Sequence, residues 1–226
     1  MAGKAVRLDM TMMFAMHDAL RRELVRIARI TAHQDPDPRH VLATALGWEM
    51  FKSYLRIHHT SEDDALWPGM FQELAGQPED LALLDAMEAE HAAIDPLLNA
   101  IDAAIADPGS GPQRLGDLTD GLVTTLTGHL EHEEKETLPL ISATLTRQQW
   151  QHFTEIHRSR IGSDVSRYFP WLLDNADPTT VEAVLGRLPE NVRNTYHDDW
   201  QPAYARFDLW HDRDPQPGRR PPGMAG

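Results

Sequence analysis

The sequence predicts an all-α protein, an up-down-up-down four-helix bundle followed by a C-terminal helical appendage. Along four long stretches, apolar residues recur at steps of three and four, which is the pattern of amphipathic helices. Short breaks containing proline or glycine separate these stretches, so neighbouring helices are expected to run antiparallel. No window shows the β-branched alternation that is typical of a strand.

The first two predicted helices are separated by a proline-rich break. Residues 8–33 form the first helix, with a core stripe of Met13, His17, Leu20, Leu24 and Ile27. Residues 35–38, with the sequence Asp-Pro-Asp-Pro, end it. The second helix is predicted to start near Arg39 and to run into His58 and His59, with Pro68 and Gly69 interrupting it. Its apolar residues are Trp48, Phe51, Tyr54 and Leu55.

The third and fourth helices follow the same pattern. A break at residues 76–78 precedes the third helix, whose stripe consists of Leu84, Met87, His91, Ile94, Leu98 and Ile101. Residues 107–112 are the clearest loop in the sequence. A fourth helix is predicted over about residues 113–143, with a stripe of Leu115, Leu118, Leu122, Leu126 and His129. Residues 1–145 are therefore predicted to form the bundle.

The character of the chain changes after Thr146. Helical pieces become shorter, prolines punctuate them, and four of the six tryptophans lie here: Trp150, Trp171, Trp200 and Trp210. So many aromatic side chains are seldom all left in water, so residues 146–211 are predicted to pack on the bundle as a helical extension. Residues 212–226 are rich in proline and glycine and poor in apolar side chains, which predicts a disordered tail.

Composition excludes several classes of function. The 226-residue chain has a formal net charge of −14, so nucleic acid and anionic membrane surfaces would repel it. It has no cysteine, which excludes disulfides, thiolate metal sites and iron–sulfur clusters. Charged residues interrupt the first twenty positions, and no apolar run approaches the roughly 18 residues of a membrane span. We therefore expect a cytoplasmic protein that binds neither nucleic acid nor membrane.

A histidine and a glutamate recur at the same spacing in the second and fourth helices. The segments that begin at His58 and His129 each give a glutamate four residues later, an acid directly after it, and a proline at the tenth step. Spacing four places His58 with Glu62, and His129 with Glu133, on one helix face. The first and third helices each add one histidine in the core stripe, His17 and His91. The chain therefore reads as a duplicated helix pair.

The duplication also selects among neighbouring histidines. His59 and His132 have acids at the same spacing of four, Asp63 and Glu136. Their counterparts in the other repeat are Leu130 and Ser61, which cannot ligate a metal comparably. We therefore interpret His59 and His132 as neighbours of the site or as solvent-facing residues.

Together the repeats predict a metal site of four imidazoles and two carboxylates: His17, His58, Glu62, His91, His129 and Glu133. Without a metal, six polar groups on core faces would be costly to desolvate. Imidazole suits iron, and a carboxylate can bridge two cations. Zinc, or a single ion, remains open because ligand type favours iron without excluding other metals.

These residues resemble the hemerythrin family in its HHE cation-binding form, whose pattern is histidine, His-x-x-x-Glu, histidine and His-x-x-x-Glu. The match covers about residues 8–143. The resemblance implies a hemerythrin-like bundle with a non-haem diiron centre. His17 and His58 would bind one iron, His91 and His129 the other, and Glu62 and Glu133 would bridge them.

The chain departs from oxygen-carrying members of that family, which have a fifth histidine one turn from the third-helix ligand. One turn before and after His91 the chain has Met87 and Asp95. Met87 is interpreted as core, whereas Asp95 could ligate or orient a ligand. Coordination positions would then stay open on both irons, which favours sensing or redox chemistry over reversible oxygen carriage. Tyr54, one turn before His58, is either a donor to the site or a core tyrosine bonded elsewhere.

Three functions remain open from sequence. The first is binding or sensing of oxygen, nitric oxide or peroxide, or redox handling of that small molecule, with the extension as the reporting element. The second is an enzyme, a diiron oxidase or oxygenase or a catalase-like protein, and the third is iron storage or sensing. An enzyme for organic substrates needs a cavity of a few hundred cubic ångströms reaching the metals, whereas a gas or peroxide needs only a narrow path. A homodimer is also kept as an assembly.

Overall fold

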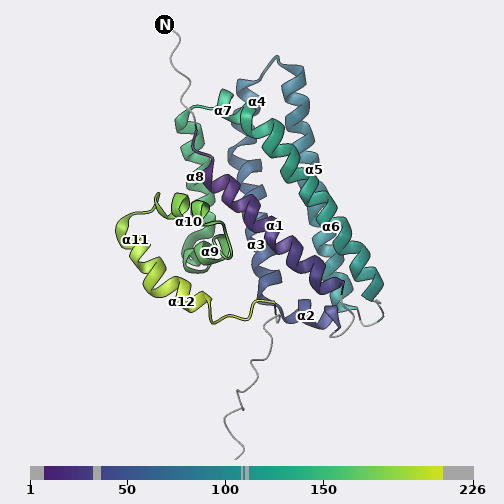
Figure 1. The fold of residues 1–226 in the computed structure, drawn as a ribbon. Helices are drawn as coiled ribbons and strands as arrows, with labels where there is room; N and C mark the ends of the chain where they lie inside the picture. The colour runs from purple at the N-terminus through teal and green to yellow at the C-terminus, as the bar shows by residue number, and fades with distance from the viewer. Residues whose placement is uncertain (1–7, 33–36, 108, 110–111, 211–226) are drawn as a thin grey trace, which may run out of the picture.

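Four long helices form the body of the protein (Figure 1). The computed structural model describes residues 8–32, 37–107, 109 and 112–210. The long helices are α1 (Thr11–Thr31), α3 (Leu46–Ala65), α5 (Pro78–Ala106) and α6 (Pro112–His132). Helix α6 lies along both α1 and α5. No described residue lies in a strand, and the all-α bundle prediction is confirmed.

The second predicted helix is divided at Ala45. Asp37 accepts a hydrogen bond from the Arg39 amide and Pro38 occupies the first turn, so α2 (Pro38–Thr44) starts as expected. Ala45 is then extended, and α3 begins at Leu46. The single helix expected from near Arg39 was therefore wrong at this point.

The break at Ala45 makes room for the C-terminal end of the described chain. The Gly47 amide donates to the Leu209 carbonyl oxygen at 2.8 Å. The Trp210 ring lies against Gly47 so closely that a Cβ there would come within 2.3 Å of a ring carbon. A contact between residues this far apart in sequence could not be read from helical periodicity.

Prolines also interrupt the fourth predicted helix. Helix α6 continues as a π-helical turn, η1 (Glu133–Thr137), and then as α7 (Leu138–Thr144), which has Pro139 in its first turn. Pro139 has no amide hydrogen and its ring would clash with the carbonyl of an ideal helix, so the wider turn accommodates it. In the other half Pro68 has a similar effect, because α3 ends before it and α4 (Trp67–Glu73) begins.

Two apolar clusters fill the bundle, and the predicted histidine positions lie between them. One cluster contains Leu20 and Leu55 together with Trp171 and Trp210, and the other contains Met13, Leu84 and Trp67 with Trp150. On α1, Met13 belongs to the second cluster and Leu20 to the first, with His17 between them. The fold therefore places a polar layer between two apolar clusters of the interior.

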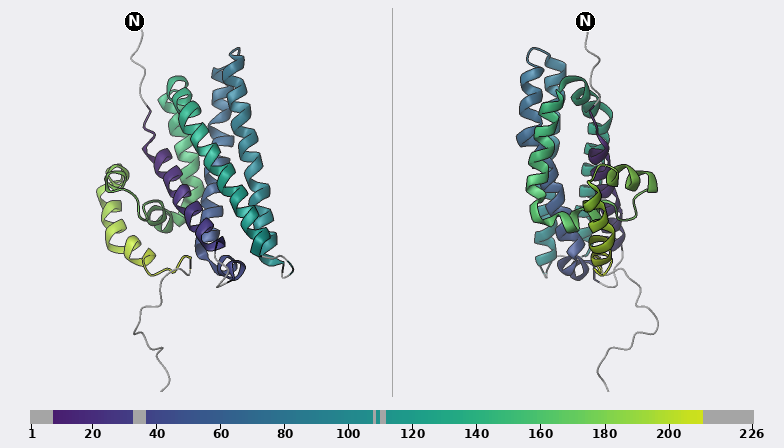
Figure 2. Two further views of the ribbon diagram at one scale, coloured as in Figure 1. Left: turned by 45° about the vertical axis from the view of Figure 1, so that its right-hand side comes forward. Right: turned by 90° about the vertical axis from the view of Figure 1, so that its left-hand side faces the viewer.

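The C-terminal extension consists of shorter helices. These are α8 (Arg147–Ile161), the 3-10 turn η2 (Gly162–Asp164), α9 (Val165–Leu172), α10 (Pro178–Leu185), α11 (Glu190–Thr195), the π turn η3 (Tyr196–Trp200) and α12 (Gln201–Tyr204). Helix α8 lies along α3, while α9 and α10 lie against α1 (Figure 2). Trp150, Trp171 and Trp210 are buried, and their apolar clusters include bundle side chains. The extension and the bundle therefore share a core.

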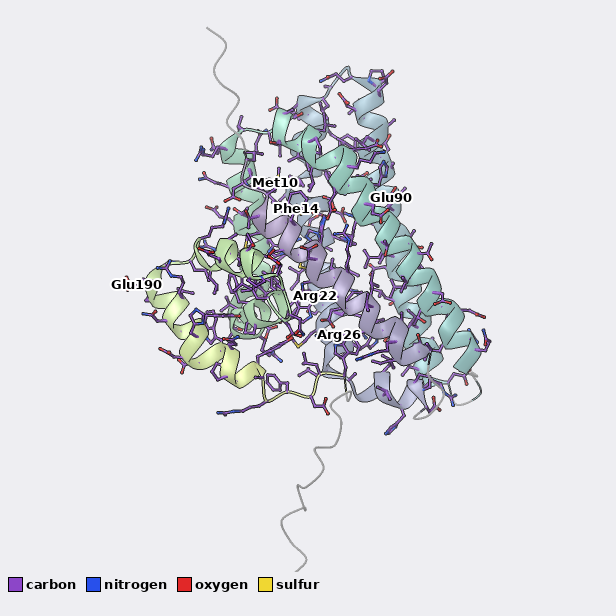
Figure 3. The ribbon with its side chains drawn as sticks, in the orientation of Figure 1. Met10, Phe14, Arg22, Arg26, Glu90 and Glu190 are labelled. Carbon is purple, nitrogen blue, oxygen red and sulfur yellow. The ribbon has the colours of Figure 1, made fainter. Side chains whose placement is uncertain are left out.

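Arginines on α1 connect the bundle to this extension (Figure 3). Arg22 donates to the carbonyl oxygens of Trp171 and Leu172 at 3.2 and 2.8 Å. Arg26 joins the buried Glu23 to Asp174, at 2.7 and 2.6 Å. No helix in the described ranges is long and apolar enough to cross a membrane. The predicted disordered tail, residues 212–226, lies outside the described part of the chain.

Replacing Gly47 with alanine should destabilise the protein, because the new methyl group would overlap the Trp210 ring. We expect a loss of about 1–3 kcal/mol in the free energy of unfolding, measured by denaturant titration. Gly116→Ala is the matched control, since that helical glycine has open space around its Cβ position. The control should be neutral or stabilising by up to about 1 kcal/mol. Equal effects of the two variants would contradict the packing of Trp210 on α3.

Replacing Glu23 with glutamine should change how stability depends on pH. Burial raises the pKa of the Glu23 carboxyl from 4.5 to about 7, although Arg26 opposes this shift. A carboxyl with a raised pKa favours the folded state when protonated, so wild-type stability should fall as pH rises from 4.5 to 7 and then level off. Relative to wild type, Glu23→Gln should gain up to about 3 kcal/mol between pH 5 and pH 8. A stability difference independent of pH would contradict this prediction.

Candidate metal centre

The structure brings all six sequence-predicted residues into one buried layer. His17 comes from α1, His58 and Glu62 from α3, His91 from α5, His129 from α6 and Glu133 from the start of η1. His91 is the most exposed of them, at 7 %. Helical spacing of four explains why each glutamate faces the same way as the histidine before it. No loop contributes to this set, so the centre rests on the bundle itself.

The four imidazoles form two pairs. His17 Nε2 lies 3.1 Å from His58 Nε2, and His91 Nε2 lies 3.2 Å from His129 Nε2. Two nitrogens bound at right angles to one ion at about 2.1 Å would be about 3.0 Å apart. Each imidazole pair therefore has the separation expected of two ligands to one ion.

The two carboxylates span the pairs. Glu62 Oε1 lies 3.5 Å from His58 Nε2, and its Oε2 lies 3.5 Å from His91 Nε2. Glu133 Oε2 lies 3.2 Å from His17 Nε2 and 3.9 Å from His129 Nε2. Both glutamates therefore contact one histidine of each pair.

The glutamate oxygens lack hydrogen bonds. None of the four accepts one from any described residue, although both side chains are fully buried. An unpartnered buried carboxylate is costly, whereas a carboxylate that coordinates a cation is not. The residues present therefore fit a pair of cations between the two histidine pairs.

Without a cation, the pKa values of the buried glutamates and histidines shift because their charges interact. Burial, together with repulsion from Glu133, raises the pKa of the Glu62 carboxyl well above its usual value. Burial alone would lower the pKa of His17, but Glu133 and Glu134 together outweigh it and raise that pKa to about 9. Burial would raise the pKa of Glu133, but the neighbouring histidines, His17 above all, lower it. Both shifts favour a positive charge beside the Glu133 carboxylate, carried by a proton on His17 when no cation is bound.

A second set of acids orients the imidazoles from outside. Glu134 lies 2.9 Å from the Nδ1 atom of His17, Asp63 lies 2.7 Å from that of His91, and Glu90 lies 2.9 Å from that of His129. A carboxylate on Nδ1 fixes the tautomer in which Nε2 is free to ligate, and raises the basicity of that nitrogen. Arg21 in turn holds Glu134 through two bonds of 2.8 and 2.9 Å.

Sequence reasoning did not assign these outer acids. Asp63 and Glu134 directly follow the predicted bridging glutamates, and their repetition in both halves was the available signal. Glu90 had no such signal, because its counterpart before His17 is Met16. Glu90 also bonds His132 at 2.8 Å, so His132 is a neighbour of the layer that reaches toward solvent.

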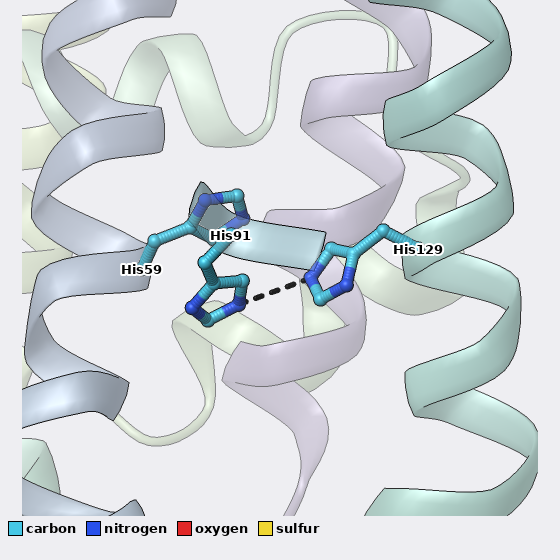
Figure 4. Close-up of side chains that lie close together, drawn as sticks. All are labelled: His59, His91 and His129. Carbon is cyan, nitrogen blue, oxygen red and sulfur yellow. Dashed lines mark hydrogen bonds between the residues drawn. The ribbon is translucent and has the colours of Figure 1, made fainter. Parts of the chain in front are cut away.

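His59 lies closer to the layer than the sequence register alone implied. Two groups of side chains offer ligand atoms within 4.8 Å of one another. One consists of His17, His58 and Glu133. The other consists of His59, His91 and His129 (Figure 4). The His59 ring stacks on His91 with centroids 4.0 Å apart and planes 8° from parallel. Its Nε2 has no hydrogen-bond partner among the described residues.

Other residues considered from sequence have different roles. Asp95, which the sequence left open as a ligand, is exposed and pairs with Arg56 at 3.2 Å rather than with a residue of the layer. Met87 is a core residue. The Tyr54 hydroxyl donates to Asp164 of the extension rather than to the layer.

Among the histidines of the extension, His157 packs near His58, with ring centroids 6.2 Å apart. Burial lowers the pKa of His157 to about 4. His152 and His197 are exposed, and His211 lies outside the described residues.

Fold and site together define a helical-bundle protein built to bind cations. The family profile of the Hemerythrin HHE cation binding domain matches residues 9–141, and the chain belongs to this family. The resemblance drawn from the sequence is thereby confirmed. No curated protein and no solved structure matches the chain. The chain is thus a cation-binding HHE domain whose two buried triads are consistent with a binuclear metal site.

Removing an outer acid should weaken metal binding without removing a ligand. Glu90→Ala and Glu134→Ala each delete the carboxylate that holds an Nδ1 atom, and each should raise the metal dissociation constant about 10- to 100-fold. Competition with a coloured chelator would measure this constant. Glu136→Ala is the control, because Glu136 lies on the same turn as Glu134 but pairs with Lys135 at the surface. Indistinguishable dissociation constants for all three variants would contradict the orienting role.

Proposed function

We propose that this chain is a non-haem diiron protein that binds or senses a small molecule, oxygen, nitric oxide or peroxide, or handles it by redox chemistry. The proposal rests on two buried carboxylates without hydrogen bonds, Glu62 and Glu133, each of which lies near one histidine of both imidazole pairs. One iron would be held by His17 and His58 and the other by His91 and His129, with both glutamates bridging.

The ligand types support iron. Nitrogen and carboxylate-oxygen donors without thiolate suit iron, and two bridging carboxylates neutralise part of the charge of two nearby cations. When bound, the two ions supply reversible electron transfer and positions to which a small molecule can add. Four histidines and two glutamates would leave such positions open on both ions.

The protein would keep these positions dry and fixed. Apolar clusters lie on both sides of the layer, and three carboxylates, Glu134, Asp63 and Glu90, hold the imidazoles in place. A layer shielded in this way excludes bulk water and raises the strength of each electrostatic interaction within it. A molecule with two non-hydrogen atoms, such as oxygen, nitric oxide or peroxide, is the kind of ligand that such a site would admit.

One observation favours a catalase-like enzyme as the second candidate. A cavity of about 320 Å³ between α3 and α5 is lined by His59 and His91, so the layer is reached from one side. Its other walls carry mainly charged and polar side chains, whereas sites for organic ligands are usually apolar. The cavity therefore supports a small polar reactant such as peroxide better than an organic substrate. Iron storage, the third candidate, would have no need of open positions.

The first test is metal content per chain, with the visible absorption spectrum of the reduced protein before and after oxygen and then peroxide. Two irons and a lasting oxygen-dependent band would support binding or sensing, whereas two irons with rapid oxidant turnover would support the enzyme. Glu62→Ala and Glu133→Ala should each lower metal content and melting temperature, because each removes a bridging ligand. Glu131→Ala, an exposed position on α6, is the control. Unchanged metal stoichiometry in both bridging variants would refute the site.

A further inference from the structure

The cavity between α3 and α5 joins the surface to one end of the histidine layer. Its volume is about 320 Å³ and its walls are formed by Leu55, Arg56, His59, Thr60, Asp63, Glu88, His91, Ala92, Ile94 and Asp95. His91 is one of the six predicted ligands. Two larger cavities among the described residues, of about 500 and 600 Å³, are lined by none of those six.

The charges around this cavity favour a cation. Three acids, Asp63, Glu88 and Asp95, outnumber Arg56. Arg56 is engaged by Asp95 at 3.2 Å, and Asp63 is engaged by His91 and by the Trp67 indole. Glu88 is exposed and has no partner among the described residues, so it carries the uncompensated charge at the mouth.

His59 forms part of the wall of this cavity, and no hydrogen bond in the described structure accounts for its Nε2 atom. The residue is 6 % exposed, and its Nε2 atom is buried without a hydrogen-bond partner. A buried unsatisfied polar atom of this kind calls for an occupant.

The nitrogens of His59 and His91 lie within 4.8 Å of each other, but their stacked rings are not oriented toward one common ion. A histidine binds metal through a lone pair in the plane of its ring, about 2.1 Å from the nitrogen. The two rings are nearly parallel, with centroids 4.0 Å apart, so an ion in the plane of one ring lies far from the plane of the other. His59 is therefore suited to hold an ion before or after His91 does, rather than at the same time.

We propose that this cavity is the route by which a divalent cation enters the centre, with His59 as a transient ligand between the acidic mouth and the His91–His129 pair. The inference deepens the proposed function, on which it rests. A hydrated ion would be attracted by Glu88, would exchange water for the His59 nitrogen, and would then pass to His91 and His129. The His59 ring contacts both of these rings, with centroids 4.0 and 5.1 Å away.

The experiment compares rates with equilibrium constants. Full-length protein depleted of metal is mixed with Co²⁺ and loading is followed by absorbance, and release from the loaded protein to a chelator is followed separately. His59→Phe keeps a ring that can stack on His91 but removes the nitrogens. It should slow loading and release by the same factor, about tenfold, which corresponds to about 1.4 kcal/mol in the barrier. Stoichiometry and dissociation constant should stay unchanged, because a residue on the route alters only the barrier.

A second variant tests the route without altering any buried residue. Glu88→Gln removes one exposed charge at the mouth and should slow Co²⁺ loading about two- to fivefold at low ionic strength, an effect that salt should abolish. Glu131→Gln is the matched control on α6, outside the cavity, and should load at the wild-type rate.

Two results would overturn the route. Unchanged loading rates in both His59→Phe and Glu88→Gln would mean that the ion enters elsewhere. A weaker dissociation constant or a lost ion in His59→Phe, with the loading rate unchanged, would make His59 a permanent ligand instead. Wild-type protein that takes up no second ion would refute the proposed function itself, whatever the loading rates of the variants.

Discussion

The rest of the structure depends on one constraint, the burial of six ionisable groups in a single layer of a helical bundle. Such a layer is tolerable only if every imidazole is oriented and every carboxylate has a cation or a proton near it. Asp63, Glu90 and Glu134 orient three of the four imidazoles, and apolar clusters lie on both sides of the layer. Stability and cation binding are therefore served by the same side chains, so a change to one will be felt by the other.

The layer also ties the two helix pairs together. Glu62 and Asp63 belong to the first pair but both reach His91 of the second, while Glu133 and Glu134 of the second pair both reach His17 of the first. Each helix pair therefore depends on acids from the other pair to surround its own histidines. These contacts join the two similar units through the layer. The extension packs on α1 and α3, the two helices of the first unit that carry predicted ligands.

Sequence predicted the part of this arrangement that repeats. Spacing of four on a helix and recurrence in two segments were enough to select His58, Glu62, His129 and Glu133, and the core stripe added His17 and His91. What could not be predicted depends on contacts between distant segments. The break at Ala45 follows from Trp210 lying on Gly47, the role of Glu90 follows from the approach of α5 to α6, and the position of His59 depends on how closely α3 faces α5. The sequence left the role of Asp95 open, and its position on α5 places it at the surface beside Arg56.

The two helix pairs differ at the residue directly before the histidine of their first helix. Glu90 precedes His91 and supports His129, whereas Met16 precedes His17 and leaves His58 without a comparable acid. An imidazole whose Nδ1 faces a carboxylate is a stronger donor than one that does not. In the His91–His129 half both rings face a carboxylate, whereas in the other half only His17 does. Two cations bound in the two halves would therefore meet differently supported donors, because the duplicated scaffold differs at this one position.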